Sequence, residues 1–238
     1  QTLRQFGKYV VDELELADVN PMRKLKRLPH VKTDQRHPRR ILTPEELQRV
    51  LAAAAAAPSR KGLDGPTRSL LYWFMASTGL RLGECRTLVV SDLRLNSLDP
   101  HVSVKAAHTK NSQSAELPLK RDLADALKDY VQQSNKLPTA VLFSGSRKEI
   151  NDHLADAFAL DLRDAGIAYR DDAGEYADLH SLRHYFGTRL AESDLSIHEV
   201  QRLMRHSSIV TTQRYMHAAK DRMRKGVESL PKLSIKSA

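Results

Sequence analysis

The sequence has one cysteine, few aromatic residues and no long apolar run. A lone Cys85 excludes a disulfide within the chain and is typical of a reducing compartment. Aromatic residues make up 5% of the chain, so we expect a core mainly of Leu, Ala, Val and Ile. No apolar run approaches the roughly 20 residues of a membrane span. The opening QTLRQFGKYV also lacks a signal-peptide layout, and we expect a cytoplasmic protein.

Motifs for metals and nucleotides are lacking too. The histidines are not paired with Cys, Asp or Glu at ligand spacing, and one cysteine cannot build a zinc site. The sequence has no Gly-x-x-x-x-Gly-Lys-Ser/Thr phosphate loop. We therefore expect no metal, no ATP and no other cofactor.

What the sequence has in excess is positive charge. Lys and Arg number 38 against 29 Asp and Glu, which gives a net charge of +9 and a pI near 9.7. A polyanion-binding surface needs such a surplus, because each neutralised phosphate releases counterions. A merely basic protein has the same composition, so the positions of the charges must decide.

The first 40 residues predict a helix followed by a basic linker. Residues 1–20 favour one helix that ends before Asn20-Pro21. A lone helix and the missing initiator Met predict the C-terminal remnant of an N-terminal domain, in a fragment of a longer protein. Residues 21–40 read as an extended linker, either a solvated tether or, as we favour, a strap along a phosphate backbone. Its candidate DNA-binding residues are Arg23, Lys24, Lys26 and Arg27.

Residues 41–220 predict one mainly α-helical domain with a small antiparallel β-sheet. Thr43 and Glu46 form a capping box with Pro44 at the first helical position, and Gly79 is expected to cap the second helix. The stretch HVSVKAAHTKNSQSAELPL predicts a hairpin with Lys110 near its turn. Further helices follow, one of which starts at a second capping box formed by Ser196 and Glu199. Residues 221–238 predict a short helix and a tail.

A scattered set of cations and one tyrosine remains as candidate chemistry. Arg81 follows a helix end, and His180 and Arg183 share one helix face because they are three residues apart. Taken alone, Tyr215 is a packing residue, the histidines are core or capping residues, and the arginines are salt-bridge partners. Only the combination favours catalysis, and its members are Arg81, Lys110, His180, Arg183, His206 and Tyr215.

Phosphoryl transfer is the reaction that this set suits. Arginine forks match the charge that builds on the oxygens of a phosphodiester under attack. A histidine adds hydrogen bonding or proton transfer, and a lysine can protonate the leaving oxygen. A phenol, with a pKa near 10, becomes a good nucleophile when cations stabilise its phenolate.

The motifs resemble those of the tyrosine recombinase, or phage integrase, family. The matching pieces are TGLRLGE, the hairpin lysine in HTKNSQSAELPL, LHSLRHYFGTRL and LMRHSSIVTTQRYMH, in the order found in the family. The resemblance covers about residues 41–220, and NPMRKLKRLP is similar to the interdomain linker. It implies a mainly helical catalytic domain, one half of a C-shaped clamp around DNA.

The resemblance also implies a role for each residue. Arg81 and Arg183 would hold the scissile phosphate, and Lys110 would protonate the 5′ oxygen. His180 would assist proton transfer from the tyrosine, and His206 would hydrogen-bond the phosphate. Tyr215 would attack and leave a 3′-phosphotyrosyl link. Glu84 would brace Arg81.

One residue departs from the family pattern. The family usually has LGHSS, whereas this chain has MRHSS with Arg205 in place of glycine. Glycine at this point would permit a backbone turn or a close approach to DNA. We include Arg205 among the candidate DNA-binding residues, and its effect on the reaction stays open.

The implied partners are double-stranded DNA recombination sites, a homo-tetramer on DNA and accessory DNA-bending proteins, which places the protein at the nucleoid. A phage or other mobile element is the expected source. In this family the C-terminal tail docks on a neighbouring protomer, for which Leu230, Leu233 and Ile235 are candidates. The alternative to a docking tail is a disordered one. The alternatives to a recombinase are a type IB-like topoisomerase and a non-catalytic DNA-binding relative.

Overall fold

The structure, a computed structural model, describes residues 2–24, 38–106, 114–143 and 147–216. The chain forms two compact units, Gln1–Pro38 and Arg39–Ala238, which are treated separately below. Within the described ranges, no helix is both long and apolar enough to cross a membrane.

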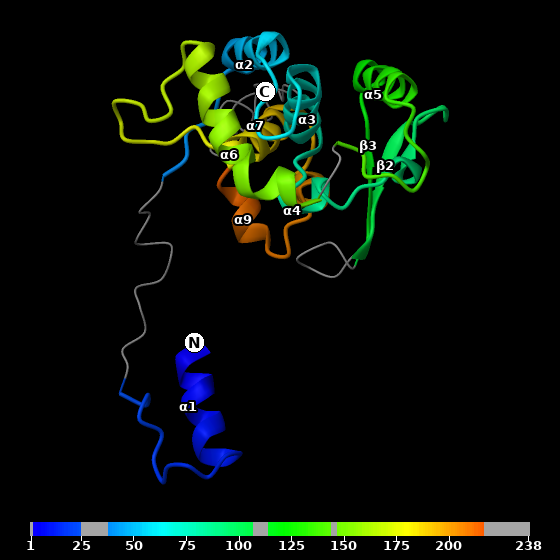
Figure 1. The fold of residues 1–238 in the computed structure, drawn as a ribbon. Coiled ribbons are helices and arrows are strands. Elements are labelled where there is room, and N and C mark those ends of the chain that lie inside the picture. The colour runs from blue at the N-terminus through cyan, green and yellow to red at the C-terminus, as the bar shows by residue number, and fades with distance from the viewer. Residues whose placement is uncertain (1, 25–37, 107–113, 144–146, 217–238) are drawn as a thin grey trace, which may run out of the picture. The chain divides into compact units, whose positions relative to one another are not determined.

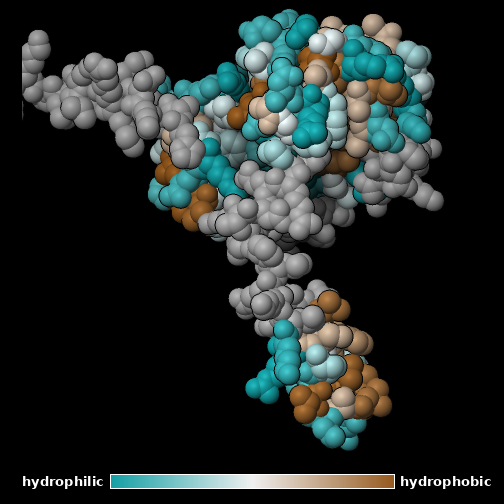
Figure 2. Space-filling view, turned by 90° about the vertical axis from the view of Figure 1, so that its left-hand side faces the viewer, coloured by the Kyte–Doolittle hydropathy of each residue, from teal (hydrophilic) through white to brown (hydrophobic). Residues whose placement is uncertain are grey.

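The first unit contains helix α1, Thr2–Asp12, which is shorter than the sequence predicts. The Leu14 N–H donates to the Tyr9 carbonyl, and Glu15 has a positive φ of 49°, so the chain turns out of the helix. The side chain of Asn20 returns to Gly7, where a Cβ would lie 2.2 Å from its Oδ1. Apolar side chains stay exposed along α1, as the brown patches of the lower unit in Figure 2 show.

The second unit is mainly helical with one small antiparallel sheet, which confirms the predicted fold class (Figure 1). Its elements are α2 (Pro44–Ala56), α3 (Gly65–Thr78), α4 (Leu82–Cys85), the 3-10 turn η1 (Val90–Asp92), β1 (Leu93–Arg94), β2 (His101–Val104), β3 (Ala115–Pro118), α5 (Arg121–Gln133), α6 (Arg147–Asp164), α7 (Leu179–Glu192), α8 (Ile197–Met204) and α9 (Ile209–Gln213).

The predicted hairpin is present as strands β2 and β3. They pair antiparallel, from His101 opposite Pro118 to Val104 opposite Ala115. The two-residue strand β1 adds to the other side of β2, a pairing too short to leave a pattern in the sequence. Residues 107–113, where the sequence predicts the turn and Lys110, lie outside the described residues.

The predicted helix caps are confirmed. The Thr43 and Ser196 hydroxyls accept hydrogen bonds from the backbone N–H of Glu46 and Glu199, and both glutamates reach back to complete capping boxes. Gly79 ends α3 with φ 62° and ψ 15°, a left-handed conformation that glycine adopts without strain. These caps fix where α3 stops and where α8 starts, and both ends border the site described below.

Helix α3 lies at the centre of the unit. Its side chains Leu71, Tyr72 and Phe74 are fully buried, and it packs against α2, α5 and α7. The apolar core continues into the sheet, α5 and α6. The start of α4 and the helix α7 are therefore held on a rigid support, as catalytic geometry requires.

A buried ion pair links α3 to α6. Asp161 is fully buried and accepts hydrogen bonds from the Arg68 Nε at 3.0 Å and the Tyr72 hydroxyl at 2.9 Å. Arg60 adds a third donor at 2.6 Å. Arg68 is also fully buried, and it donates to the Leu63 carbonyl at 2.8 Å. Every charge in this cluster therefore has a partner, which is the condition for a buried pair to be stable.

Removing the Asp161 carboxylate is expected to destabilise the protein strongly. In Asp161→Ala the Arg68 guanidinium stays buried without its counter-charge, which costs roughly 3–5 kcal/mol of unfolding free energy. Urea unfolding followed by the fluorescence of the single tryptophan, Trp73, measures the loss. Asp164→Ala is the matched control, because that carboxylate also pairs with Arg60 but is partly exposed. An equal loss in both variants would contradict the prediction.

Candidate active site

Arg81 lies at the junction of α3 and α4, where it is the N-cap residue of α4. The Glu84 carboxylate accepts the Arg81 backbone N–H at 2.7 Å and its guanidinium at 3.3 Å. Glu84 is buried, whereas the Arg81 side chain is about one third exposed, at 32%. Glu84 thus braces Arg81 in the way that the sequence predicts, and part of the guanidinium still faces solvent.

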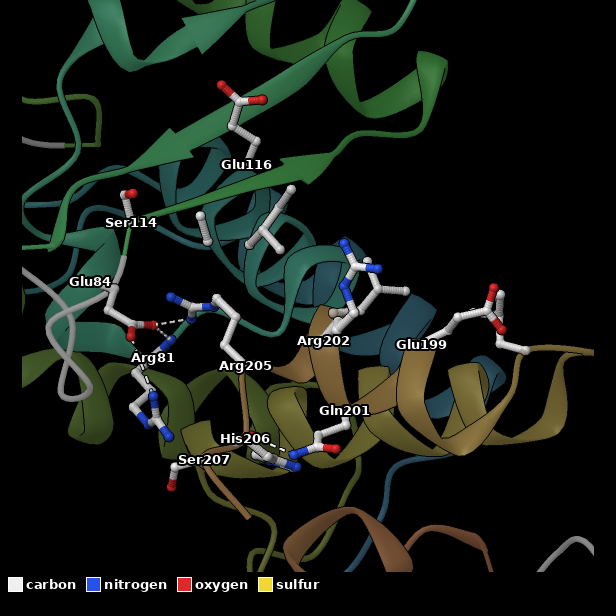
Figure 3. Close-up of a pocket in the computed structure, with 14 residues that line it drawn as sticks. Arg81, Glu84, Ser114, Glu116, Glu199, Gln201, Arg202, Arg205, His206 and Ser207 are labelled. Carbon is white, nitrogen blue, oxygen red and sulfur yellow. Dashed lines mark hydrogen bonds and ion pairs between the residues drawn. The ribbon is translucent and has the colours of Figure 1, made fainter. Parts of the chain in front are cut away.

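Arg205 contributes a second arginine to the same carboxylate. Its guanidinium donates to Glu84 at 2.6 Å, across 121 residues of sequence. Burial opposes ionisation of Glu84, but hydrogen bonding and the charge of Arg205, with help from Arg81, keep the pKa of this carboxyl below its ordinary value. Figure 3 shows both arginines directed at Glu84. The side chain of Arg205 therefore acts within the protein, in contact with the group that holds Arg81.

The backbone of Arg205 adopts a conformation that suits glycine better than arginine. Arg205 ends α8 in the left-handed region, with φ 52° and ψ 44°. Glycine adopts this conformation freely, whereas a residue with a Cβ is strained by about 1–2 kcal/mol. We expect Arg205→Gly to be about 1 kcal/mol more stable than Arg205→Ala, the reverse of their order in a helix. Urea unfolding of the two variants checks this, and a more stable alanine variant would contradict it.

Arg183 is the most deeply buried arginine of the site, at 3% exposed. From the first turns of α7 its guanidinium donates to the Gly79 carbonyl at the end of α3 and to the Met204 carbonyl at the end of α8. Burial and the charges of Arg81 and Arg205 lower the pKa of Arg183 to about 10, so it stays charged at pH 7. Arg183 therefore ties together the segments that carry Arg81 and His206.

His206 follows Arg205 and is held by the chain around it. Its Nδ1 lies 2.9 Å from the Thr212 hydroxyl, and its backbone carbonyl accepts the Gln201 side-chain amide at 3.1 Å. Burial, with the charges of Arg183 and Arg81, lowers the pKa of His206 to about 4. The imidazole is therefore neutral at pH 7 and acts as a hydrogen-bonding group.

Tyr215 lies two residues beyond the end of α9, with its ring against α7. Its ring is stacked on that of His206, at 6.1 Å between centroids and 10° between planes. Gly187 makes room for it, since a Cβ there would be 2.9 Å from the Cε1 and Cζ of Tyr215. Burial raises the pKa of Tyr215, an effect that the charges of Arg183, Arg214 and Arg81 oppose. The phenol is therefore protonated at neutral pH.

Two histidines of α7 approach Tyr215. His184 Nδ1 lies 2.9 Å from the phenol oxygen. His180, one turn earlier, places its ring edge-on to His184 with centroids 5.1 Å apart. Desolvation and the charges of neighbouring cations lower the pKa of both to about 4, although the side chain of His180 stays exposed. Both rings are neutral at pH 7, and the one in contact with the phenol is His184.

A pocket of about 950 Å³ opens beside these groups, between α4, β3 and α8. Arg81, Arg205 and His206 line one side, and Ser114 and Glu116 from the sheet line another (Figure 3). A smaller pocket of about 300 Å³ reaches His180 and Arg183 from the side of α6. In the part of the chain that the structure describes, no three His, Cys, Asp or Glu side chains are grouped to hold a metal ion.

The structure thus brings Arg81, Glu84, His180, Arg183, His206 and Tyr215 into one region of the second unit. Lys110 and the tail residues Leu230, Leu233 and Ile235 lie outside the described residues. Of the candidate linker residues, Arg23 and Lys24 are exposed in the first unit, and Lys26 and Arg27 also lie outside the described residues.

Sequence reasoning passed over His184 and Gly187. Both stand in the motif LHSLRHYFGTRL, and His184 is four residues after His180, a spacing that puts the two on one helix face. That spacing was the available signal. What the sequence could not supply is the approach of Tyr215, which comes from 31 residues away.

Comparisons with known proteins show the family to which the chain belongs. The phage integrase family model matches residues 40–222. The chain is 25% identical over 231 residues to tyrosine recombinase XerC of Bacillus subtilis, across 93% of this chain and 69% of that protein. It is 31% identical over 219 residues to a tyrosine recombinase of Pseudothermotoga lettingae, across 91% of this chain and 68% of that protein.

Solved structures show the same fold. The XerH site-specific recombinase bound to a palindromic difH substrate superposes with a TM-score of 0.66 at 22% identity, over 94% of this chain and 63% of that one. The fold and the cluster of cations around Tyr215, taken with these relatives, define a tyrosine recombinase. The chain belongs to the phage integrase family. The predicted recombinase is thereby confirmed as the class of protein, and the topoisomerase alternative is not favoured.

Proposed function

We propose that this chain cuts and rejoins double-stranded DNA at specific recombination sites, with Tyr215 as the nucleophile. The observation that carries the proposal is the position of the phenol. It is half-buried, stacked on His206 and hydrogen-bonded to His184, and the charges of Arg183 and Arg81 act on its ionisation. A phenol beside two neutral imidazoles and under the influence of several cations is suited to attack a phosphodiester.

The roles of the other groups follow from their chemistry. Arg81 and Arg183 hold the scissile phosphate, and Glu84 fixes Arg81 through the bonds described above. His206 donates a hydrogen bond to a phosphate oxygen from the ring nitrogen that does not face Thr212. Lys110 protonates the leaving 5′ oxygen, as the family resemblance implies.

The covalent link makes a metal and ATP unnecessary. In the 3′-phosphotyrosyl intermediate the bond energy of the broken phosphodiester is kept, and a 5′-hydroxyl from another strand can attack it to reseal the DNA. The guanidinium groups supply the positive charge at the transition state that a metal supplies elsewhere.

The partners are DNA sites and further copies of the protein. Among the structural relatives, XerH is bound to difH DNA and a lambda integrase dimer is bound to a COC′ core site. For this chain we propose a tetramer on DNA, accessory DNA-bending proteins, a mobile-element source and a place at the nucleoid in the cytoplasm. We also propose that residues 1–20 belong to a DNA-binding domain, 21–40 to a linker, 41–220 to the catalytic domain and 221–238 to a docking tail.

Covalent trapping tests the nucleophile and finds the site in one experiment. The protein is incubated, with EDTA and without ATP, with a pool of nicked duplexes whose central sequence is randomised. Cleavage next to the nick releases a short fragment and leaves the DNA attached to the protein. We expect adducts, which sequencing assigns to a shared DNA motif and peptide mass spectrometry assigns to Tyr215. Attachment to another residue, or binding of the pool with no adduct, would overturn the proposal.

A further inference from the structure

Among the described residues, the phenol of Tyr215 is hydrogen-bonded to His184, which is not the histidine that the family resemblance indicates. His184 Nδ1 lies 2.9 Å from the Tyr215 oxygen. The rings of the two residues are 5.6 Å apart at an angle of 44°. His180 contacts His184, with 5.1 Å between ring centroids, so its link to the phenol runs through His184.

The resting protonation states place a proton on the phenol and an acceptor on His184. Burial raises the pKa of Tyr215, so the phenol keeps its proton at pH 7 and needs an acceptor to become a nucleophile. The pKa of the His184 imidazole is lowered to about 4 by burial and by the nearby His180, Arg39 and Arg183, against the attraction of Asp178. The imidazole is therefore neutral at pH 7, with one ring nitrogen free to accept a hydrogen bond. Because a base of low pKa is weak, the proton moves to His184 only as the phenol oxygen bonds to phosphorus and its O–H becomes strongly acidic.

The groups around His184 come from four segments. The charged and titratable side chains that act on it or contact it are Arg39 before α2, Asp178 at the N-cap of α7 with His180 and Arg183 on α7, His206 after α8, and Tyr215 after α9. Arg39 in turn pairs with Asp178 at 2.6 Å, which fixes both at the start of α7. The balance is cationic, so it disfavours a protonated His184 at rest.

We propose that His184 is the catalytic base that takes the proton of Tyr215 in the cleavage step. This inference rests on the proposed function. As the phenol oxygen forms its bond to phosphorus, the O–H bond breaks and the proton passes to Nδ1 of His184. The bond from phosphorus to the 5′ oxygen breaks, and that oxygen takes a proton from Lys110. In the resealing step a 5′-hydroxyl attacks phosphorus and gives its proton back to Lys110, while the bond from phosphorus to the Tyr215 oxygen breaks and His184 returns its proton to that oxygen, so protons balance over the cycle.

His180 has a different task in this scheme. Its ring lies behind His184 and not against the phenol, so it is a positioning residue that keeps the His184 ring in place. General acid-base catalysis by a correctly placed side chain contributes roughly 10²–10⁴-fold to a rate. We assign that contribution to His184.

The pH profile of single-turnover cleavage separates a base from a packing residue. The matched variant is His184→Asn, because the amide can accept the same hydrogen bond at the position of Nδ1 but cannot hold a proton. With a nicked substrate, we expect the wild-type rate to change little from pH 6 to 9, since His184 is neutral throughout. We expect His184→Asn to be roughly 10²–10⁴-fold slower at pH 7 and to gain rate tenfold per pH unit as Tyr215 ionises by itself.

Each alternative gives a different profile. If His184 only positions the ring of Tyr215, His184→Asn keeps most of the wild-type rate, or its rate changes with pH in the same way as that of wild type. Either result overturns the inference. If His180→Gln gains rate with pH and His184→Asn does not, His180 is the base and the inference is also overturned. Thermal melting of each variant confirms that the fold is intact.

A substrate with sulfur in place of the bridging 5′ oxygen gives a second readout. A thiolate leaves without a proton. This substrate therefore raises the cleavage rate of a variant that lacks the acid, but not of a variant that lacks the base. We expect Lys110→Ala to recover and His184→Asn to stay slow, and recovery of His184→Asn would overturn the inference. Failure of the proposed function is distinguishable, because wild type would then form no adduct with Tyr215 at any pH.

Discussion

Replacing Tyr215 with phenylalanine abolishes the covalent protein–DNA adduct and leaves the fold and DNA binding in place. The substitution removes only the phenol oxygen. The ring that stacks on His206 and lies over Gly187 is retained, and the single bond lost is the one to His184. Loss of one hydrogen bond costs about 1 kcal/mol of stability. Adduct formation on a nicked substrate, gel-shift binding and thermal melting measure the three properties.

The matched control for this experiment is Tyr185→Phe. Tyr185 also lies on α7, but its ring is packed by Arg189, with 5.6 Å between the guanidinium carbon and the ring centre. We expect Tyr185→Phe to form the adduct as wild type does. An adduct of unchanged yield in Tyr215→Phe would show that another residue attacks.

Arg183→Ala is expected to lower the cleavage rate by roughly 10³-fold or more, the loss typical when a transition-state cation is removed. Binding of the same DNA is expected to weaken less than tenfold, because the other cations still contact the backbone. In the proposed mechanism the guanidinium acts mainly on charge that develops during the reaction, and interactions of that kind change the rate more than the affinity. Single-turnover cleavage and gel-shift titration give the two numbers.

The contacts of Arg183 require a control for structure. Because it donates to the Gly79 and Met204 carbonyls, Arg183→Ala leaves two buried acceptors and is expected to lower the melting temperature as well. Millimolar guanidinium, far below denaturing concentration, should restore part of the cleavage rate by entering the vacated space. Equal loss of binding and cleavage, with no recovery, would make Arg183 a structural or binding arginine only.

The sequence predicted what depends on neighbours along the chain. The capping boxes at Thr43 and Ser196 span three residues, and the left-handed cap at Gly79 depends on one residue type. The sequence did not reveal that α1 ends at Asp12, because the turn at Glu15 uses a residue with no preference for a positive φ. It also gave no sign of β1.

The candidate site was predictable as a set of residues and not as a network. Motifs in the family order named Arg81, Arg183, His206 and Tyr215. The bonds that organise them join residues far apart in sequence, such as Arg205 with Glu84 and His184 with Tyr215. Pairings of this kind depend on how α4, α7 and α8 meet, which no local pattern encodes. Arg205 was visible as unusual, but its partner was not.

Gly187 has a consequence for how this enzyme can evolve. A glycine inside a helix costs roughly 0.5–1 kcal/mol relative to alanine, yet here it lets the ring of Tyr215 rest on the backbone of α7. An alanine would favour the helix and at the same time push the ring of Tyr215 away from its place on α7. If Tyr215 is the nucleophile as proposed, selection for a more stable α7 and selection for activity oppose each other at Gly187, a position that carries no functional group.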